Sequence, residues 1–292
     1  MTDSSLHVPV LTEETMRALA PKPGGTYADG TVGHGGHARL LLEASGPDGR
    51  LLAIDRDPRN LSVARERLAP YGGRVLFVQG SYADLSRFAQ ENGLGTFDGI
   101  LLDVGFSSAH VDDPARGFSF GADGPLDMRY DPSQETSAAT IVNGWKKEEL
   151  ATLFRLYGEE PAADRIADAI FHARKQERIV RTTQLAELVE AVVPRRGRIH
   201  PATKVFQALR IAVNDELGEL ERVLPAAADL LAPGGRLAVI SFHSLEDRIV
   251  KQFLASRDDL EALTKRPVTA SEEEMAANPR ARSAKLRAAA KR

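Results

Sequence analysis

Short apolar runs alternate with segments of helical periodicity along the first hundred residues. The apolar runs are rich in β-favouring side chains and end at Asp29, Asp55, Gly80 and Asp103. Between them, apolar residues recur three to four positions apart, which is typical of amphipathic helices. Strands alternating with helices at this spacing predict an α/β fold with a parallel, doubly wound sheet.

The pattern changes after Asp103. Residues 104–131 are rich in Gly, Asp, Phe and Pro and show little periodicity, so we expect a lid loop there. Residues 138–193 are helical in pattern, a helix is expected over 209–231, and strand character returns over 235–242. We therefore expect a discontinuous domain, 1–110 and 205–292. A lid loop and helical insert, 111–204, would separate strands four and five and recognise the substrate.

A glycine-rich turn follows the first predicted strand. Residues 27–37 read Tyr-Ala-Asp-Gly-Thr-Val-Gly-His-Gly-Gly-His, and a helical pattern begins at their end. Glycine permits a positive φ and close approach of a ligand to the backbone, while a helix start offers free N–H groups. Many such turns only connect a strand to a helix. Asp55, roughly 20 residues further on, stands where nucleotide-binding folds place the carboxylate that holds ribose hydroxyls.

Two cofactor classes use this geometry, the dinucleotides and S-adenosyl-L-methionine (SAM). The run from Gly33 to Ala38 fits the dinucleotide spacing Gly-x-Gly-x-x-Ala. An acid just before the turn, Asp29, suits SAM better, because the methionine part of SAM carries an ammonium group. The carboxyl ends of parallel strands meet at one edge, where ligands of such sheets bind. Asp29, Asp55, Tyr82 and Asp103 are expected at that edge.

The composition of the chain limits which kinds of functional site it can contain. Hydrophobic residues make up 42% and charged residues 27% of the chain, as in ordinary soluble globular proteins. No apolar run approaches the length of a membrane span, and the beginning of the chain lacks a signal pattern, so we expect a cytoplasmic protein without a membrane partner. The absence of cysteine excludes disulfides, thiolate metal sites and a thiol nucleophile. His34 and His37 are separated by two residues, but no further ligand accompanies them, so no metal site is expected.

Two basic stretches stand out in a chain of net charge −3. The first contains Arg195, Arg196, Arg198 and Lys204, and the second covers 280–287. Each is either a solvated connector or a set of phosphate contacts. Two separate patches in a slightly acidic chain favour contact with nucleic acid.

Several long blocks of this sequence resemble the MraW family, the bacterial small-subunit ribosomal RNA methyltransferases H. One block is the turn Asp-Gly-Thr-Val-Gly-His-Gly-Gly-His, and another contains Ser-Phe-His-Ser-Leu-Glu-Asp-Arg. The matching blocks stand in the family's order and cover nearly the whole chain: 7–11, 29–37, 52–57, 99–103, 116–120, 124–129, 200–217, 231–251 and 278–287.

The resemblance implies a Rossmann-like SAM-dependent methyltransferase with a helical insert. It implies methylation of the exocyclic N4 of a cytidine in the decoding region of 16S rRNA, with the assembled small ribosomal subunit as partner. By position, the family's cofactor contacts fall on Gly35, Gly36, His37, Asp55, Tyr82, Asp103 and His110. Tyr82, His110 and Phe106 depart from the family's commoner Phe, Gln and Val.

Asp103 is the predicted catalytic residue, either as a hydrogen-bond and proton acceptor for N4 or as an anchor for the SAM ammonium group. The Asp/Asn-Pro-Pro-aromatic motif of amino-methyltransferases is replaced here by Asp-Val-Gly-Phe-Ser-Ser. An NAD-dependent oxidoreductase and a non-catalytic ribosome-assembly factor remain as alternatives. The sequence leaves the oligomeric state open, including a homodimer.

Overall fold

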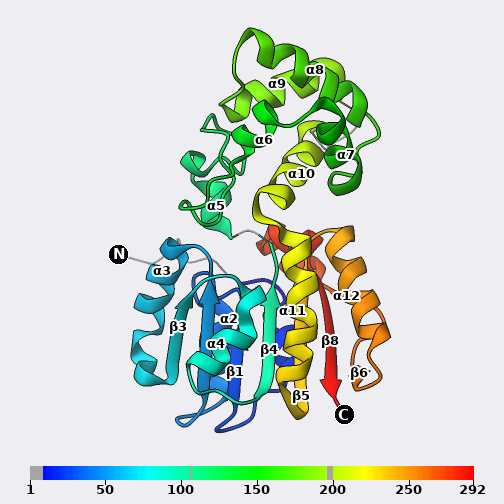
Figure 1. The fold of residues 1–292 in the computed structure, drawn as a ribbon. Coiled ribbons are helices and arrows are strands. Elements are labelled where there is room, and N and C mark those ends of the chain that lie inside the picture. Colours follow the sequence, from blue (N-terminus) through cyan, green and yellow to red (C-terminus); the bar gives the residue numbers. More distant parts are fainter. Residues whose placement is uncertain (1–8, 106, 196–199) are drawn as a thin grey trace. The chain divides into compact units, whose positions relative to one another are not determined.

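A computed structural model of the protein describes residues 9–105, 107–195 and 200–292. The chain divides into two compact units (Figure 1). The first comprises residues 1–105 and 217–292, and the second residues 106–216. The boundaries therefore fall after Gly105 and Glu216 instead of after 110 and 204, so that the whole segment 205–216 belongs to the second unit.

The first unit contains a sheet with strand order β3-β2-β1-β4-β5-β8-β6, and β7 also pairs with β8. Strands β1 to β5 pair with one another in parallel, and β8 is antiparallel to β5, β6 and β7. The bounds of the strands are β1 Thr26–Asp29, β2 Arg50–Asp55, β3 Val75–Gln79, β4 Phe97–Asp103, β5 Leu231–Ser241, β6 Leu260–Ala262, β7 Val268–Thr269 and β8 Lys285–Lys291.

Helices cover both faces of this sheet (Figure 1). Because successive side chains of a strand point to opposite faces, β2 places Leu52 and Ile54 in one apolar core and Leu51 and Ala53 in the other. Helices α4 (Leu85–Glu91), α11 (Glu216–Leu230) and α12 (Ser244–Ser256) contribute to the first core. Helices α1 (Thr12–Leu19), α2 (Gly36–Ala44) and α3 (Pro58–Leu68) contribute to the second. The doubly wound α/β fold predicted from the sequence is confirmed.

One sequence expectation was wrong in this region, and one segment for which no element was predicted contains a helix and a strand. The helix expected over 209–231 is two helices, α10 (Ala202–Asn214) and α11, separated by Asp215 at φ 50°. Aspartate tolerates the left-handed conformation better than most residues, so apolar periodicity alone did not mark the break. The charged, Ala-rich segment after 272 contains α13 (Glu272–Ala277) and strand β8. Alanine and lysine are weak strand formers, and pairing with β5 overrides that preference.

The second unit is helical and has its own apolar core. Its helices are α5 (Ser108–Asp112), α6 (Ala138–Gly144), α7 (Lys147–Tyr157), α8 (Ala163–Gln176), α9 (Thr182–Val192) and α10. The expected lid segment is organised by Arg116, which is buried and donates hydrogen bonds to the carbonyls of Arg129 and Tyr130, at 2.8 and 3.0 Å. Arg116 therefore connects the block 116–120 to the end of the block 124–129. Among the described residues, no helix combines the length and apolarity needed to cross a membrane.

Candidate functional site

The glycine turn connects β1 to α2 and requires glycine at specific positions. Gly33 and Gly35 have φ values of 50° and 79°, a region that L-residues rarely adopt. A Cβ atom on Gly36 would lie 2.8 Å from Cγ of Pro9, so the proline ring packs directly on the first residue of α2. The turn therefore brings glycine backbone and a helix N-terminus to the carboxyl edge of the sheet.

Asp55, at the end of β2, ties this turn to the sheet. Its Oδ2 accepts a hydrogen bond from Gly33 N at 2.8 Å, and its Oδ1 accepts one from Asp57 N at 2.8 Å. Asn60 Nδ2 donates to both oxygens at 3.3–3.4 Å. Burial raises the pKa of Asp55 to about 6, although these backbone donors act to lower it. A partly exposed carboxylate in this position can accept further hydrogen bonds from a vicinal diol.

Asp103 ends β4, and its side chain lies beside His37 and near Asp29. Thr31 connects the neighbouring strand ends, because its Oγ1 accepts a hydrogen bond from Asp103 N at 2.7 Å and its backbone N–H donates to Asp29 Oδ1 at 3.1 Å. His37 Nε2 lies 3.7 Å from Asp103 Oδ2. Asp103 Oδ1 is buried and has no hydrogen-bond partner among the described residues. Such an oxygen can accept a hydrogen bond from a bound molecule.

The carboxylates at this edge raise one another's pKa. Burial, followed by the charges of Asp29 and Glu246, raises the pKa of Asp103 to about 8. Burial, supported by the charge of Asp55, raises the pKa of Asp29 to about 7. Clustered acids that ionise reluctantly would ionise more readily beside a cation, because an opposite charge favours the charged form. The edge is therefore suited to a positively charged ligand.

Tyr82 follows β3, in a short 3-10 turn that begins after Ser81. Its Cβ lies near Gly30, where an added Cβ would approach it to 3.1 Å. Ser81 Oγ hydrogen-bonds to the buried carboxylate of Glu219, which also pairs with Arg56 at 3.2 Å. The corner after β3 is thus held from both the sheet and α11, and Tyr82 lies beside the turn after β1.

A further corner, between β5 and α12, was not identified from residue chemistry. Glu246 is buried, and its Oε2 accepts hydrogen bonds from the backbone N–H groups of Phe242 and His243, at 2.8 and 3.2 Å. The Phe242 ring lies against Gly105, where an added Cβ would approach Cδ2 to 3.2 Å. The spacing from His243 to Glu246 is that of a capping box, a signal that could have located this corner.

The predicted residues are distributed over both units. Gly35, Gly36, His37, Asp55, Tyr82 and Asp103 belong to the first unit, at or next to the carboxyl ends of β1, β2, β3 and β4. His110 belongs to the second unit, where its ring stacks on Phe118 at 4.8 Å and lies 5.0 Å from the Tyr130 ring.

The basic stretches are only partly described. Arg195 is exposed, whereas Lys204 donates its Nζ hydrogen bond to the carbonyl of Glu159 at 2.8 Å. Arg196 and Arg198 lie outside the described residues. In the second stretch, Arg287 is buried and its Nε lies 2.6 Å from Asp247 Oδ1, so its charge is satisfied within the fold.

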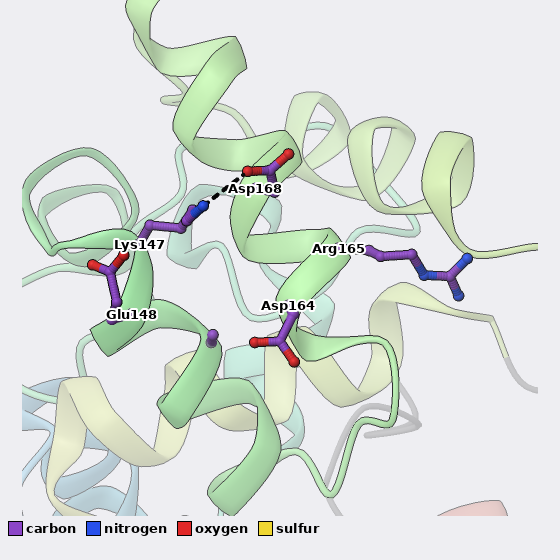
Figure 2. A pocket seen from close by; sticks show the side chains of 6 residues that line it. Lys147, Glu148, Asp164, Arg165 and Asp168 are labelled. Carbon is purple, nitrogen blue, oxygen red and sulfur yellow. Dashed lines mark hydrogen bonds and ion pairs between the residues drawn. The ribbon is translucent and has the colours of Figure 1, made fainter.

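A separate surface pocket lies between α7 and α8 of the second unit (Figure 2). Its volume is about 360 Å³. Lys147 Nζ pairs with Asp168 Oδ1 at 3.2 Å, and Arg155 pairs with Asp164 at 2.7 Å. None of the predicted site residues lines it. The lining residues are Lys147, Glu148, Ala151, Asp164, Arg165 and Asp168.

Comparison with known proteins decides between the cofactor classes that share this edge geometry. The MraW methylase family matches residues 4–292. The chain belongs to the MraW methylase family. This confirms the family and the methyltransferase class predicted from the sequence, with SAM as the methyl donor in place of a dinucleotide.

Curated relatives named "Ribosomal RNA small subunit methyltransferase H" match over almost their full length. The protein of Symbiobacterium thermophilum is 51% identical, over 98% of this chain and 96% of its own. That of Thermomicrobium roseum is 53% identical, over 98% and 94%. A solved structure of a Clostridium thermocellum protein, 13% identical, shares the fold with a TM-score of 0.50, covering 98% of this chain and all of its own.

Proposed function

We propose that this protein methylates the exocyclic N4 of a cytidine in the decoding region of 16S rRNA, using SAM. The proposal rests on membership in a methylase family whose curated relatives are named for small-subunit ribosomal RNA. The observation that carries it is Asp103, whose buried Oδ1 has no hydrogen-bond partner among the described residues, at the strand end where a methyl donor and acceptor would meet.

The residues at the edge suit the methyl donor. Asp55 would hold the ribose hydroxyls, and the backbone of the glycine turn at Gly35 and Gly36 would contact the methionine part. The Tyr82 ring would stack on the adenine. When bound, SAM supplies an electrophilic methyl group on a sulfonium centre, whose positive charge suits an edge of clustered carboxylates.

Cytidine N4 is a weak nucleophile, because its lone pair is delocalised into the ring. The protein must therefore hold the amino group in line with the methyl group, and positioning supplies much of the rate. A carboxylate that accepts a hydrogen bond from N4–H stabilises the positive charge that develops on nitrogen and can take the proton. Burial raises the pKa of Asp103 to about 8 in the ligand-free chain, and the positive charge of bound SAM would favour its ionised, proton-accepting form. Its alternative role is to anchor the SAM ammonium group.

The chain's lack of cysteine agrees with N4 as the target. Methylation of cytosine at carbon 5 generally proceeds through a cysteine adduct, whereas an amino nitrogen needs none. The target base would leave its stack to reach the edge of the sheet. Arg195, Arg196, Arg198 and Lys204 are proposed to contact rRNA phosphates, and we expect the assembled small subunit, rather than free RNA, to be the substrate.

The test is methyl transfer from labelled SAM to small subunits lacking the modification, compared with free 16S rRNA. Digestion and mass spectrometry would then locate the methyl group. Label on cytidine N4 in the decoding region, with subunits preferred over free RNA, is the expected result. Label on another base or atom would refute the assignment. Binding of subunits without any transfer would favour a non-catalytic assembly factor.

A further inference from the structure

Two segments far apart in sequence meet beside the glycine turn of the first unit. Val10 and Leu11 are buried in the same apolar core as Ala281 and Ala284. Across this contact, Glu274 Oε1 accepts a hydrogen bond from Leu11 N at 2.7 Å. We call residues 9–11 the arm. The arm is thus held by helix α13.

Both sides of this hydrogen bond are fixed by their own surroundings. Leu11 adopts φ 50°, and its carbonyl accepts a hydrogen bond from Thr15 N at 2.8 Å, so α1 determines where its amide points. Glu274 lies in the first turn of α13, where Ser271 Oγ accepts a hydrogen bond from its backbone N–H at 3.1 Å. Each partner of this hydrogen bond is therefore also held by a hydrogen bond within its own segment.

The other end of the arm bears on the glycine turn. A Cβ atom on Gly36 would lie 2.8 and 2.9 Å from Cγ and Cδ of Pro9, so the ring covers the Gly36 backbone at the start of α2. Gly36 stands between Gly35 and His37, and His37 Nε2 lies 3.7 Å from Asp103 Oδ2. Movement of Pro9 would therefore loosen the backbone and the side chain nearest the methyl-donor site.

We propose that Glu274 is a positioning residue for the methyl-donor site. Its hydrogen bond to Leu11 holds Pro9 against Gly36, which keeps the glycine turn in the conformation that binds SAM. This inference rests on the proposed function. It gives the segment around α13 a role in cofactor affinity that is separate from the phosphate contacts considered for the basic residues next to it.

The test is calorimetric titration with SAM, together with kcat and the KM for SAM, on three variants of the full chain. Glu274→Ala removes the acceptor, and we expect SAM to bind roughly fivefold to tenfold more weakly, as for the loss of a hydrogen bond of ordinary strength. Glu274→Gln keeps an acceptor oxygen and should restore most of the affinity. Glu273→Ala alters an exposed neighbour in the same helix turn and should bind like the wild type.

Glu274→Ala should raise the KM for SAM and leave kcat at saturating SAM within about twofold of the wild type, because the arm acts on SAM binding. Pro9→Ala should weaken SAM binding by a similar factor. If both residues act through one contact, the double variant should be no weaker than the weaker single variant. Fully additive losses would overturn the proposed connection.

A Glu274→Ala variant that melts at a lower temperature but binds SAM like the wild type would reduce the contact to a structural one and overturn the inference. If that variant does not fold, Pro9→Ala decides, because it leaves Glu274 and the Leu11 amide in place, and unchanged SAM affinity there would overturn the inference. Failure of the proposed function is distinguishable, since it would appear as absent SAM binding or methyl transfer in the wild type.

Discussion

The carboxyl edge of the sheet and the basic stretch at 195–204 use charge in opposite ways. At the edge, Asp29 and Asp103 are held by strand ends, and their raised pKa values follow from burial. In the basic stretch, Arg195 is exposed and Lys204 is hydrogen-bonded to a backbone carbonyl. A few fixed groups should therefore dominate catalysis, whereas many weak, salt-screened charges should share the binding of RNA.

The sharpest test of this comparison is Asp103→Asn. Loss of the acceptor should lower kcat by roughly 10²- to 10⁴-fold, the usual range for a general base, with SAM affinity within about tenfold of the wild type. Single-turnover methyl transfer and calorimetry would separate the two effects. Asp98→Asn, at the opposite end of β4, is the matched control.

Lost SAM binding in Asp103→Asn would assign Asp103 to anchoring the ammonium group. Full turnover with intact SAM binding would remove the acid–base role altogether.

Asp55→Ala should have the next largest effect. It removes the acceptor for Gly33 N as well as the proposed ribose contact, so SAM should bind roughly tenfold to hundredfold more weakly. Calorimetric titration with SAM, and separately with NAD, measures this. Asp48→Ala, an exposed acid in the turn before β2, should bind SAM like the wild type. NAD binding without SAM binding by the wild type would contradict the cofactor assignment.

The basic stretch is tested by replacing Arg195, Arg196 and Arg198 together with alanine. Binding of small subunits should weaken and depend less steeply on salt, because fewer counterions are released, while SAM affinity stays unchanged. Arg87, Lys251 and Lys265, three exposed cations elsewhere, form the control triple. Equal subunit binding in both triple variants would make the stretch a solvated connector.

The smallest expected effect concerns stability. Because the folded-state pKa of Asp103 lies above the ordinary value of 3.8, the native protein binds protons more tightly than the unfolded chain. This carboxyl therefore lowers the free energy of unfolding as pH rises from about 4 to 8. Asp103→Asn should stabilise the ligand-free protein at pH 8 by about 1–3 kcal/mol, with little change at pH 4.

Urea unfolding of both proteins across this pH range checks the expectation. If the variant is destabilised equally at both pH values, ionisation of Asp103 does not lower the free energy of unfolding.

The fold and the site could be predicted from the sequence where local patterns define them, and not where long-range contacts do. The strands ending at Asp29, Asp55 and Asp103 were predicted because each combines a buried apolar run with a terminal acid, and local patterning is enough for that. Strand β8 was missed because its partner β5 lies far away in sequence, so its pairing has no local signature. The role of Glu246 was missed for the same reason, since its effect on Asp103 arises only when α12 packs beside the strand ends.

The placement of Pro9 on Gly36 was also beyond local patterns. The sequence indicated why Gly33 and Gly35 suit a turn, but the requirement at Gly36 comes from a proline on another segment. The requirement for glycine at position 36 therefore depends on long-range packing, which local sequence patterns do not show.

The adjacency of β4 and β5 has a consequence for how the chain folds. Their pairing joins Asp103 to Ile240 across the whole of the second unit. A flexible loop of that length would make the search for this pairing slow, because contacts distant in sequence form late. A second unit with its own apolar core can fold first and shorten the effective loop. The second unit would then speed the closure of the sheet, and mutations in its core would slow the pairing of β4 with β5.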